Sequence, residues 1–372
     1  MEIQVRRLRD ALEMLTPAVP RNPTLPVLTH VRLGDGRAAA TDLEVAASVE
    51  MSEADETLLL PHKAALEFLR FTPGPKVAVI TPTRGKVSIA VDGVETAFEV
   101  ADPIDSPPIP DSGGEHEGVL DGDALLKALT AVLPYTAHEE TRPVLSGVHL
   151  ATGDTVEAVG ADGFRLAWET IPGELAGPPM NIPRKAIAAL GHLWKRGAAP
   201  EVGHARDIVG VVLAKRLIRL DWGGERLRMR FGKVTLVTHL TQGTFPNYSS
   251  LGPTETDPGV TVHAEDMQRA LRQVQPMAYD KDSKGLVRLV WEEERLILST
   301  KAAEVGEVSV PIPARSAASG RIALNIRYLL EYFLCKTGVV TFAPNKDSAT
   351  GPVLFSHRGT PHVLIMPIHT VW

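Results

Sequence analysis

The amino-acid sequence predicts an α+β fold built from three repeated domains. The chain has 372 residues, which is more than one ordinary hydrophobic core would organise. One order of elements also recurs three times: an amphipathic helix, strand-like stretches, a second helix and a closing hairpin. We therefore expect domains over residues 1–115, 116–256 and 257–372, joined by Pro- and Gly-containing linkers near 105–117 and 252–259.

Each copy opens with apolar residues spaced three or four positions apart. This spacing places them on one face of a helix, which can then be buried against a sheet. The three sets are Leu8, Leu12 and Leu15; Leu125, Leu129 and Val132; and Met267, Leu271 and Val274.

Strand-like stretches follow each of these predicted helices. We expect the first strands near 25–33, 142–150 and 286–290, and the next ones near 43–49, 165–170 and 305–310. A second helix should then begin near residues 62, 184 and 326, where apolar residues again recur at helical spacing.

Hairpins are expected to close each copy. Asp92-Gly93 separates alternating stretches at 86–91 and 94–100, and glycine accepts the positive φ that a tight turn needs. The corresponding stretches in the other copies are 217–222 with 226–231 around Gly223-Gly224, and 353–356 with 362–368.

Composition limits the classes of function. The formal net charge is -6, so a DNA partner would require positive charge to be concentrated on one surface. Cys335 is the only cysteine, which excludes an intrachain disulfide and a cysteine-based zinc site. The apolar runs are far shorter than the roughly 20 residues of a membrane span. We expect a cytoplasmic protein that does not enter membranes.

Seven short segments carry a resemblance to a known family. The segments are Pro23-Thr24-Leu25-Pro26-Val27-Leu28, Ala40-Thr41-Asp42-Leu43-Glu44, Ala161-Asp162-Gly163-Phe164-Arg165-Leu166-Ala167, Ile182-Pro183-Arg184-Lys185, Gly243-Thr244-Phe245-Pro246-Asn247-Tyr248, Asn325-Ile326-Arg327-Tyr328-Leu329 and Met366-Pro367-Ile368. They occur in that family's order and spacing, and through them the sequence resembles the β subunit of bacterial DNA polymerase III, the β sliding clamp, over essentially the whole chain.

The resemblance implies an architecture and a function. Three domains of DNA-clamp fold would form a crescent, and two crescents would close head to tail into a dimeric ring. Helices would line a central channel and antiparallel sheets would lie outside. The ring would act as a processivity factor that encircles duplex DNA. It would have no catalytic activity and no cofactor, and would tether the DNA polymerase III alpha subunit, the clamp loader and other proteins with a clamp-binding motif.

Candidate DNA contacts are basic residues on the predicted helices and on two loops that match family positions. Diffuse contacts to phosphates attract a duplex without reading its sequence. The loop around Arg142 departs from the family, because Glu139 and Glu140 precede it and the usual aromatic residues do not follow. The candidate DNA-binding residues are Arg21, Arg70, Arg142, Lys195, Arg196 and Arg269.

The resemblance also implies a hydrophobic peptide-binding cleft between the second and third domains. Aliphatic walls would bury a partner's leucine or phenylalanine, while Asn325 and Arg165 would hold its polar backbone. Phe164 replaces a usually polar residue, and the longer tail could lay Trp372 across the cleft. The expected cleft residues are Leu145, Gly163, Phe164, Arg165, Leu166, Pro246, Leu251, Asn325, Tyr328, Leu364, Ile365, Met366, Pro367 and Ile368.

The dimer interface is expected between the first and third domains. Family members often carry a phenylalanine near the end of the first domain, where this chain has Ser106 with Ile104 close by. Met277 falls near the matching helix end on the opposing side.

Two alternatives stay open. A metal-dependent hydrolase is disfavoured, because His138-Glu139 begins a zinc-protease pattern whose second histidine is replaced by Arg142. His357, His362 and His369 lie on predicted strands rather than on one helical face, so we expect no metal site and no catalytic residue. The other alternative is a divergent or accessory clamp paralogue.

Overall fold

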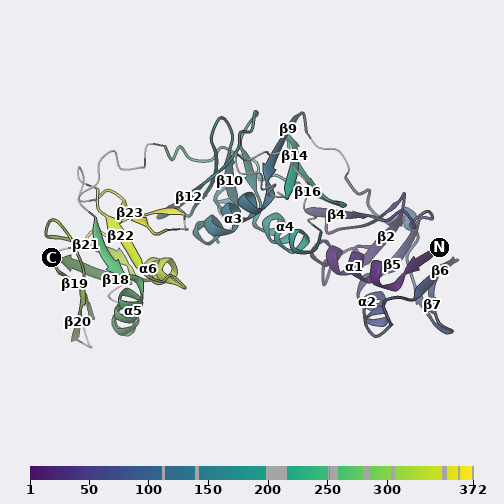
Figure 1. Cartoon of the computed structure of the whole chain (residues 1–372), viewed down its shortest axis with the longest axis horizontal. Helices are drawn as coiled ribbons and strands as arrows, with labels where there is room; N and C mark the ends of the chain where they lie inside the picture. The colour runs from purple at the N-terminus through teal and green to yellow at the C-terminus, as the bar shows by residue number, and fades with distance from the viewer. Residues whose placement is uncertain are drawn as a thin grey trace, which may run out of the picture. The chain divides into compact units, whose positions relative to one another are not determined.

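The computed structural model describes residues 1–110, 114–138, 142–197, 216–249, 251, 259–279, 285–302, 306–345, 350–358 and 361–370. Across these residues it contains 24 β-strands and six α-helices (Figure 1). Within them, no helix combines the length and the apolar character that crossing a membrane requires.

One order of elements occurs three times: a strand, a helix, four strands, a helix and three strands. The first copy is β1 (Glu2–Gln4), α1 (Val5–Leu15), β2 (His30–Gly34), β3 (Arg37–Thr41), β4 (Val45–Glu50), β5 (Leu58–Pro61), α2 (His62–Arg70), β6 (Val77–Thr83), β7 (Lys86–Val91) and β8 (Val94–Glu99). The second is β9 (His116–Asp121), α3 (Gly122–Val132), β10 (Val148–Ala151), β11 (Val156–Ala161), β12 (Arg165–Ile171), β13 (Met180–Ile182), α4 (Arg184–Gly197), β14 (Leu217–Gly223), β15 (Arg226–Phe231) and β16 (Val234–His239). The third is β17 (Val260–His263), α5 (Ala264–Ala278), β18 (Leu286–Trp291), β19 (Arg295–Ala302), β20 (Gly306–Pro313), β21 (Gly320–Asn325), α6 (Ile326–Phe333), β22 (Val339–Ala343), β23 (Val353–Ser356) and β24 (His362–Ile365).

This order confirms the predicted α+β fold with three repeats, while the domain boundaries stay predictions. The chain divides into two compact units. One consists of residues 1–130, 149–156 and 171–242, and the other of residues 131–148, 157–170 and 243–372.

The first unit contains a four-stranded sheet, β1-β6-β7-β8, and an eight-stranded sheet, β5-β2-β3-β4-β16-β15-β14-β9. Helix α1 buries Leu8, Leu12 and Leu15 completely, as its sequence spacing predicts. Helices α1 and α2 are joined where His62 Nε2 donates to the Leu12 carbonyl oxygen (2.9 Å). Helix α4 contacts α1 in the same way, through His192 and the Glu13 carbonyl oxygen (2.9 Å).

The second unit contains the four-stranded sheet β20-β19-β18-β21. It also holds most of the other eight-stranded sheet, β13-β10-β11-β12-β24-β23-β22-β17. Met267, Leu271 and Val274 of α5 are fully buried, again as predicted. Gln268 Nε2 joins α5 to the end of α6 by donating to the Phe333 and Lys336 carbonyl oxygens (2.8 Å each).

Several local expectations are corrected. Pro26–Thr29 and Pro143–Leu145 form 3-10 turns rather than strands, because proline fixes φ and cannot donate to a strand ladder. Many strands have no counterpart in the sequence prediction, among them β3, β11 and β19. The last strand ends at Ile365 instead of Ile368. The 86–100 hairpin is confirmed, with Asp92 at φ 50° and Gly93 at φ 81°, as a tight turn requires.

Each eight-stranded sheet consists of two four-stranded halves joined edge to edge. The last strand of the second repeat, β16, pairs antiparallel with β4, the fourth strand of the first repeat in chain order. The pairing runs from Thr238↔Val45 to Val234↔Val49. The last strand of the third repeat, β24, pairs in the same way with β12 of the second, beginning at Ile365↔Arg165. We call these pairings joint 1 (β4·β16) and joint 2 (β12·β24).

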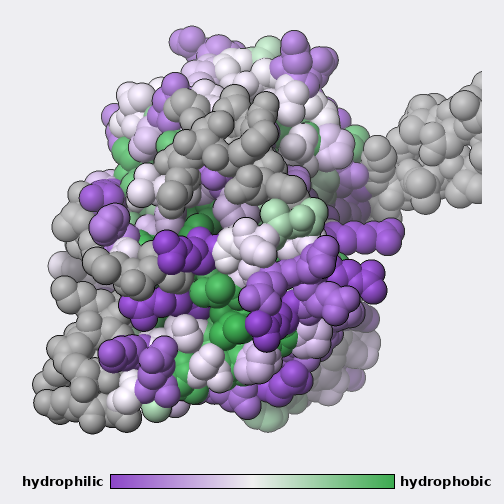
Figure 2. Space-filling view, turned by 90° about the vertical axis from the view of Figure 1, so that its left-hand side faces the viewer, coloured by the Kyte–Doolittle hydropathy of each residue, from purple (hydrophilic) through white to green (hydrophobic). Residues whose placement is uncertain are grey.

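Two strands in equivalent positions remain at sheet edges. They are β8, the last strand of the first repeat, and β20, the strand of the third repeat that corresponds to β4 and β12. The joint strands β4 and β16 are mostly buried, whereas β8 has no buried residue and β20 has only Ile312. Figure 2 looks onto the side where β19 and β20 lie in Figure 1, and apolar surface is visible there between hydrophilic side chains.

Candidate functional site

The candidate site lies at the start of joint 2, where a tight loop connects β11 to β12. The Asp162 carboxylate accepts hydrogen bonds from the backbone N–H groups of Phe164 (2.9 Å) and Arg165 (2.7 Å). Gly163 has a φ of 92°, and a Cβ at this position would lie 2.6 Å from Arg142 Nη1. Glycine therefore allows both the loop geometry and the close approach of Arg142.

Arg165 is the buried centre of the site. Its side chain is only 2% exposed and forms ion pairs with Asp162 (2.9 Å) and Glu331. Its guanidinium also lies 4.3 Å from the centre of the Tyr328 ring and 5.4 Å from that of Tyr135. These contacts join the guanidinium to the side chains around it. Its contact with a partner's backbone stays a prediction.

The titrating groups around Arg165 respond to this burial. Burial alone opposes the charged form of Glu331, but hydrogen bonds from Arg327 and Arg165 hold the pKa of its carboxyl below the usual value. Burial raises the pKa of the Tyr135 phenol to about 12. Glu331 is therefore ionised and Tyr135 neutral near neutral pH.

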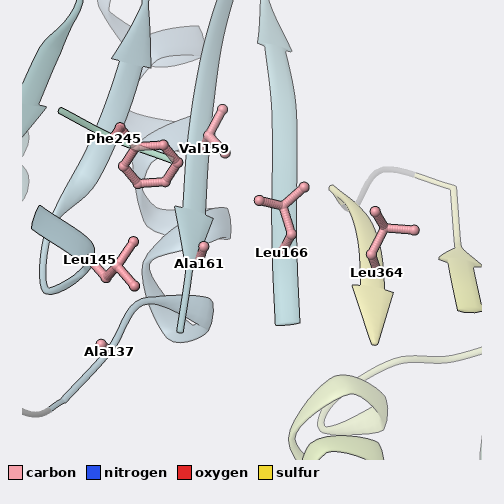
Figure 3. Packing of buried hydrophobic residues seen from close by; sticks show 7 residues of the cluster. All are labelled: Ala137, Leu145, Val159, Ala161, Leu166, Phe245 and Leu364. Carbon is pink, nitrogen blue, oxygen red and sulfur yellow. The ribbon is translucent and has the colours of Figure 1, made fainter. Parts of the chain in front are cut away.

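An apolar cluster forms the floor beside Arg165 (Figure 3). Val159 and Ala161 come from β11, Leu166 from β12 and Leu364 from β24, so the two strands of joint 2 bring their side chains together. Phe245, from the segment after β16, belongs to the same cluster and lies beside Val159. Leu145 and Ala137 complete the cluster.

An open pocket of about 250 Å³ lies over this floor. Nine of the fourteen predicted cleft residues line it: Leu145, Gly163, Phe164, Arg165, Leu166, Pro246, Leu251, Leu364 and Met366. The sequence prediction missed four more lining residues: Ala161, Phe245, Tyr248 and Pro352. Phe245 and Tyr248 lie in the same short segment as Pro246, so this segment was the available signal.

Five predicted cleft residues lie elsewhere. Asn325 caps α6 by accepting from the Arg327 N–H (2.9 Å). Ile365 is fully buried in β24, and Pro367 and Ile368, which follow this strand, are half-buried. Tyr328 lines a second, neighbouring pocket.

The second pocket, of about 200 Å³, adjoins the first through Phe164. Phe164 is 59% exposed and stacks on Tyr328, with ring centres 6.3 Å apart. The other walls of this second pocket include Arg142, Arg327 and Asp162. Phe164 therefore separates an apolar pocket from one lined by charged side chains.

The six predicted DNA-binding residues are all exposed. Arg70 ends α2, Lys195 and Arg196 lie in the last turn of α4, and Arg269 on α5 pairs with Asp266 (2.6 Å). Arg21 precedes the 3-10 turn at Pro26, and Arg142 lies against Gly163. Their role as DNA contacts stays a prediction.

The predicted dimer residues lie close to β8 and at the end of α5. Ile104, in the segment after β8, is 85% exposed, while Ser106 and Met277 are half-buried. Phe71, which follows α2, is 87% exposed.

The described residues contain no cluster of three or more histidine, cysteine or acidic side chains able to hold a metal ion. His357 Nε2 donates to the Thr337 carbonyl oxygen (2.8 Å), and His362 stacks on Trp168. Trp372 lies outside the described residues.

Comparisons with known proteins agree on one family. The family model for the central domain of the DNA polymerase III beta subunit matches residues 119–247. The beta sliding clamp of Synechococcus elongatus is 26% identical over 379 residues, covering 97% of this chain and 96% of the relative. The Escherichia coli beta sliding clamp is 23% identical over 343 residues, covering 88% of each chain.

Solved structures match over the full length. The DNA polymerase III subunit beta from Pseudomonas aeruginosa has a TM-score of 0.84 at 19% identity, with all of both chains covered. A sliding clamp from Bartonella birtlesii, solved bound to griselimycin, has a TM-score of 0.82 at 21% identity, covering 100% of this chain and 99% of that one. Residues 119–247 are thus similar to the central domain of the DNA polymerase III beta subunit, and the whole chain is similar to beta sliding clamps and has the fold of the solved ones.

Proposed function

We propose that this protein is a DNA sliding clamp, a processivity factor that encircles duplex DNA and tethers replication and repair proteins. The observation that carries the proposal is that one kind of edge-to-edge strand pairing occurs twice within the chain, at joints 1 and 2. In the described part of the chain, strands β8 and β20 are left unpaired at the equivalent edges of the two four-stranded sheets. A protein of this kind needs no catalytic centre of its own.

Ring closure follows from pairing these edges between two copies. The last strand of one repeat pairs with the fourth sheet strand of the preceding one at both joints, so β8 of one copy would pair with β20 of another. Because β8 and β20 belong to opposite ends of the same chain, the arrangement is head to tail, and two such contacts close a dimer. Closure would also remove two exposed sheet edges.

Several apolar residues support this interface. Val94 on β8 is 61% exposed, and Ile104 and Phe71 are exposed still further. Tyr279, directly after α5, is also exposed. Large apolar side chains that are solvent-exposed in the monomer would become buried on closure, which is the main driving force for association.

Duplex DNA would be retained because the ring encloses it, and not because individual contacts bind it tightly. Basic side chains on α2, α4 and α5 would contact phosphates diffusely and allow sliding. The acidic balance of the whole chain, -6, would keep non-specific attraction to the outer surface low.

The pocket at joint 2 would bind a short linear motif of a partner. Its apolar floor suits a leucine or phenylalanine side chain, and the open rim leaves room for an extended peptide. The partners would include the DNA polymerase III alpha subunit and the clamp loader. Each motif alone would bind at about micromolar strength, and attachment to the ring would raise its effective concentration. We further propose a cytoplasmic location, in keeping with the single exposed thiol of Cys335.

The test is retention on DNA after loading. A topologically linked ring stays on a nicked circular plasmid and is lost when one restriction cut opens the circle. Equal retention on circular and linear DNA would contradict encirclement and indicate an ordinary surface binder.

A further inference from the structure

A further pocket, which shares no residue with the peptide cleft, lies at the Glu50 end of joint 1. Its volume is about 410 Å³. The position equivalent to the cleft is the Val45 end of β4, whereas this pocket lies at the Glu50 end of the same strand. We call it the basic pocket.

Four elements build the basic pocket. They are the exposed side of α1, the end of β4, the last turn of α4 and the turn between β15 and β16. Its lining includes Arg6, Arg7, Met14, Met51, Arg196 and Lys233.

These elements are firmly connected. The Glu50 N–H donates to the Lys233 carbonyl oxygen (2.9 Å), which holds the β15–β16 turn against β4. Gly197 brings α4 so near the sheet that a Cβ there would lie 2.4 Å from Val234 Cγ2. The pocket is therefore a preformed concavity, which lowers the ordering cost of binding.

The rim is cationic. Arg6, Arg7, Arg196 and Lys233 outnumber the two carboxylates of the lining, Asp10 and Glu50. Arg7 pairs with Glu53, and Arg6 lies 3.9 Å from Asp10, both side chains of this second pair being mostly exposed. Among the described residues, Lys233 forms no ion pair. In a chain of net charge -6, this is a local excess of positive charge suited to an anionic ligand.

The floor is apolar. Ala11, Val49, Met51 and Val234 are buried beneath it, and Met14 is half-buried. Methionine side chains adapt to irregular apolar partners. A DNA backbone offers phosphates to the rim but has no aliphatic group to bury on this floor, so the combination favours a peptide over a duplex.

We propose that the basic pocket docks a linear segment of a partner protein that carries one large aliphatic residue flanked by aspartates or glutamates. The aliphatic side chain would lie on Met14 and Met51, and the carboxylates would face Lys233, Arg6 and Arg196. This site goes beyond the proposed cleft function, because it lies at joint 1 and shares no residue with the cleft at joint 2. Arg196 is also a DNA candidate, so the experiment has to separate the two ligands.

The test uses the full chain with Met366→Asp, which places a carboxylate in the cleft and suppresses binding of acidic peptides there. The probe is a fluorescein-labelled peptide with two aspartates on each side of a leucine. The control peptide has glycine in place of the leucine. We expect saturable binding of the leucine peptide, and loss of about tenfold or more in affinity for the glycine peptide, since one leucine side chain is no longer buried.

The variant Lys233→Glu should weaken binding by about fivefold, because it reverses an exposed rim charge without touching the core. Arg84→Glu, an equal charge change in the exposed β6–β7 turn, is the matched control and should leave the affinity within about twofold. Equal effects of the two variants, or equal binding of the two peptides, would overturn the proposal. Retention on circular DNA is measured for the same two variants. If Lys233→Glu, but not Arg84→Glu, loses this retention while the protein binds neither peptide, the pocket serves DNA instead.

Discussion

Joints 1 and 2 have the same strand pairing and the same backbone hydrogen bond at its start, but their side chains differ. In joint 1 the His239 N–H donates to the Glu44 carbonyl oxygen, and in joint 2 the Met366 N–H donates to that of Phe164. Glu44 thus corresponds to Phe164, and His239 to Met366. Charged or polar residues at one joint are replaced by apolar ones at the other.

The ion pairs of the two joints differ in burial. At joint 1, Lys185 binds Asp42 (2.7 Å) and Glu44 (2.8 Å) with a side chain that is 44% exposed. At joint 2, the bridging Arg165 is 2% exposed. The same strand pairing therefore occurs at both joints, while the side chains at its start make joint 1 polar and joint 2 apolar around a buried arginine.

The largest expected effect comes from Arg165→Met. It removes the cation between Asp162 and Glu331 and leaves Asp162 almost buried without its partner, so the free energy of unfolding should fall by about 3 kcal/mol. Lys185→Met is the matched change at joint 1; it also leaves a buried carboxylate, Asp42, without its ion-pair partner, but Lys185 itself is 44% exposed, so the loss should be smaller, about 1 to 2 kcal/mol. Urea denaturation measures both, and equal losses would contradict the difference between the joints.

Several helices and a hairpin could be predicted from the sequence, but the burial of the ion pairs at the two joints could not. Periodic leucines located α1, α3 and α5, and Asp92-Gly93 located a hairpin, because these signals are local. Strand β3, with its Arg37–Thr41 run of alanines, lacks the alternation that marks a strand, and it was missed. The burial of Arg165 depends on Glu331 and Tyr328, which are more than 160 positions away along the chain. Only the resemblance to a family indicated the pocket.

Next in size is Met366→Asp, which puts a charge at the rim of the apolar pocket. A partner's leucine would lose a contact worth about 2 kcal/mol, so the affinity for a fluorescent leucine-phenylalanine peptide should fall by about thirtyfold. His239→Asp makes the equivalent change at joint 1 and should leave peptide affinity unaltered. Similar losses in fluorescence anisotropy titrations would mean that the peptide does not bind at joint 2.

A smaller effect is expected for Phe164→Ala. Loss of the exposed ring that stacks on Tyr328 should weaken the same peptide by about fivefold, in the range of one aromatic contact. Glu44→Ala at joint 1 serves as the control. An unchanged Kd for Phe164→Ala would show that this ring is not part of the bound surface.

The smallest expected effect is a pH dependence specific to joint 2. Because the folded-state pKa of Glu331 lies below its ordinary value, its contribution to stability is present above pH 4.5 and is lost as the pH falls through the lowered folded pKa. Glu331→Gln should therefore flatten the acid limb of the urea midpoint plotted against pH. At joint 1, burial alone would lower the pKa of Lys185, but Asp42 and Glu44 raise it, so that contribution is lost only as the pH rises above 10.5. An acid limb unchanged in Glu331→Gln would argue against the Glu331 assignment.

The central claim is that a third joint of the same kind forms between two chains. Amide hydrogen exchange tests it directly, because edge amides are protected only when another strand pairs with them. At concentrations where sedimentation shows a dimer, β8 and β20 should exchange slowly, and on dilution to monomer they should exchange fast, while β4, β12, β16 and β24 stay protected throughout. Fast exchange of β8 and β20 in a sedimenting dimer would contradict ring closure through these edges.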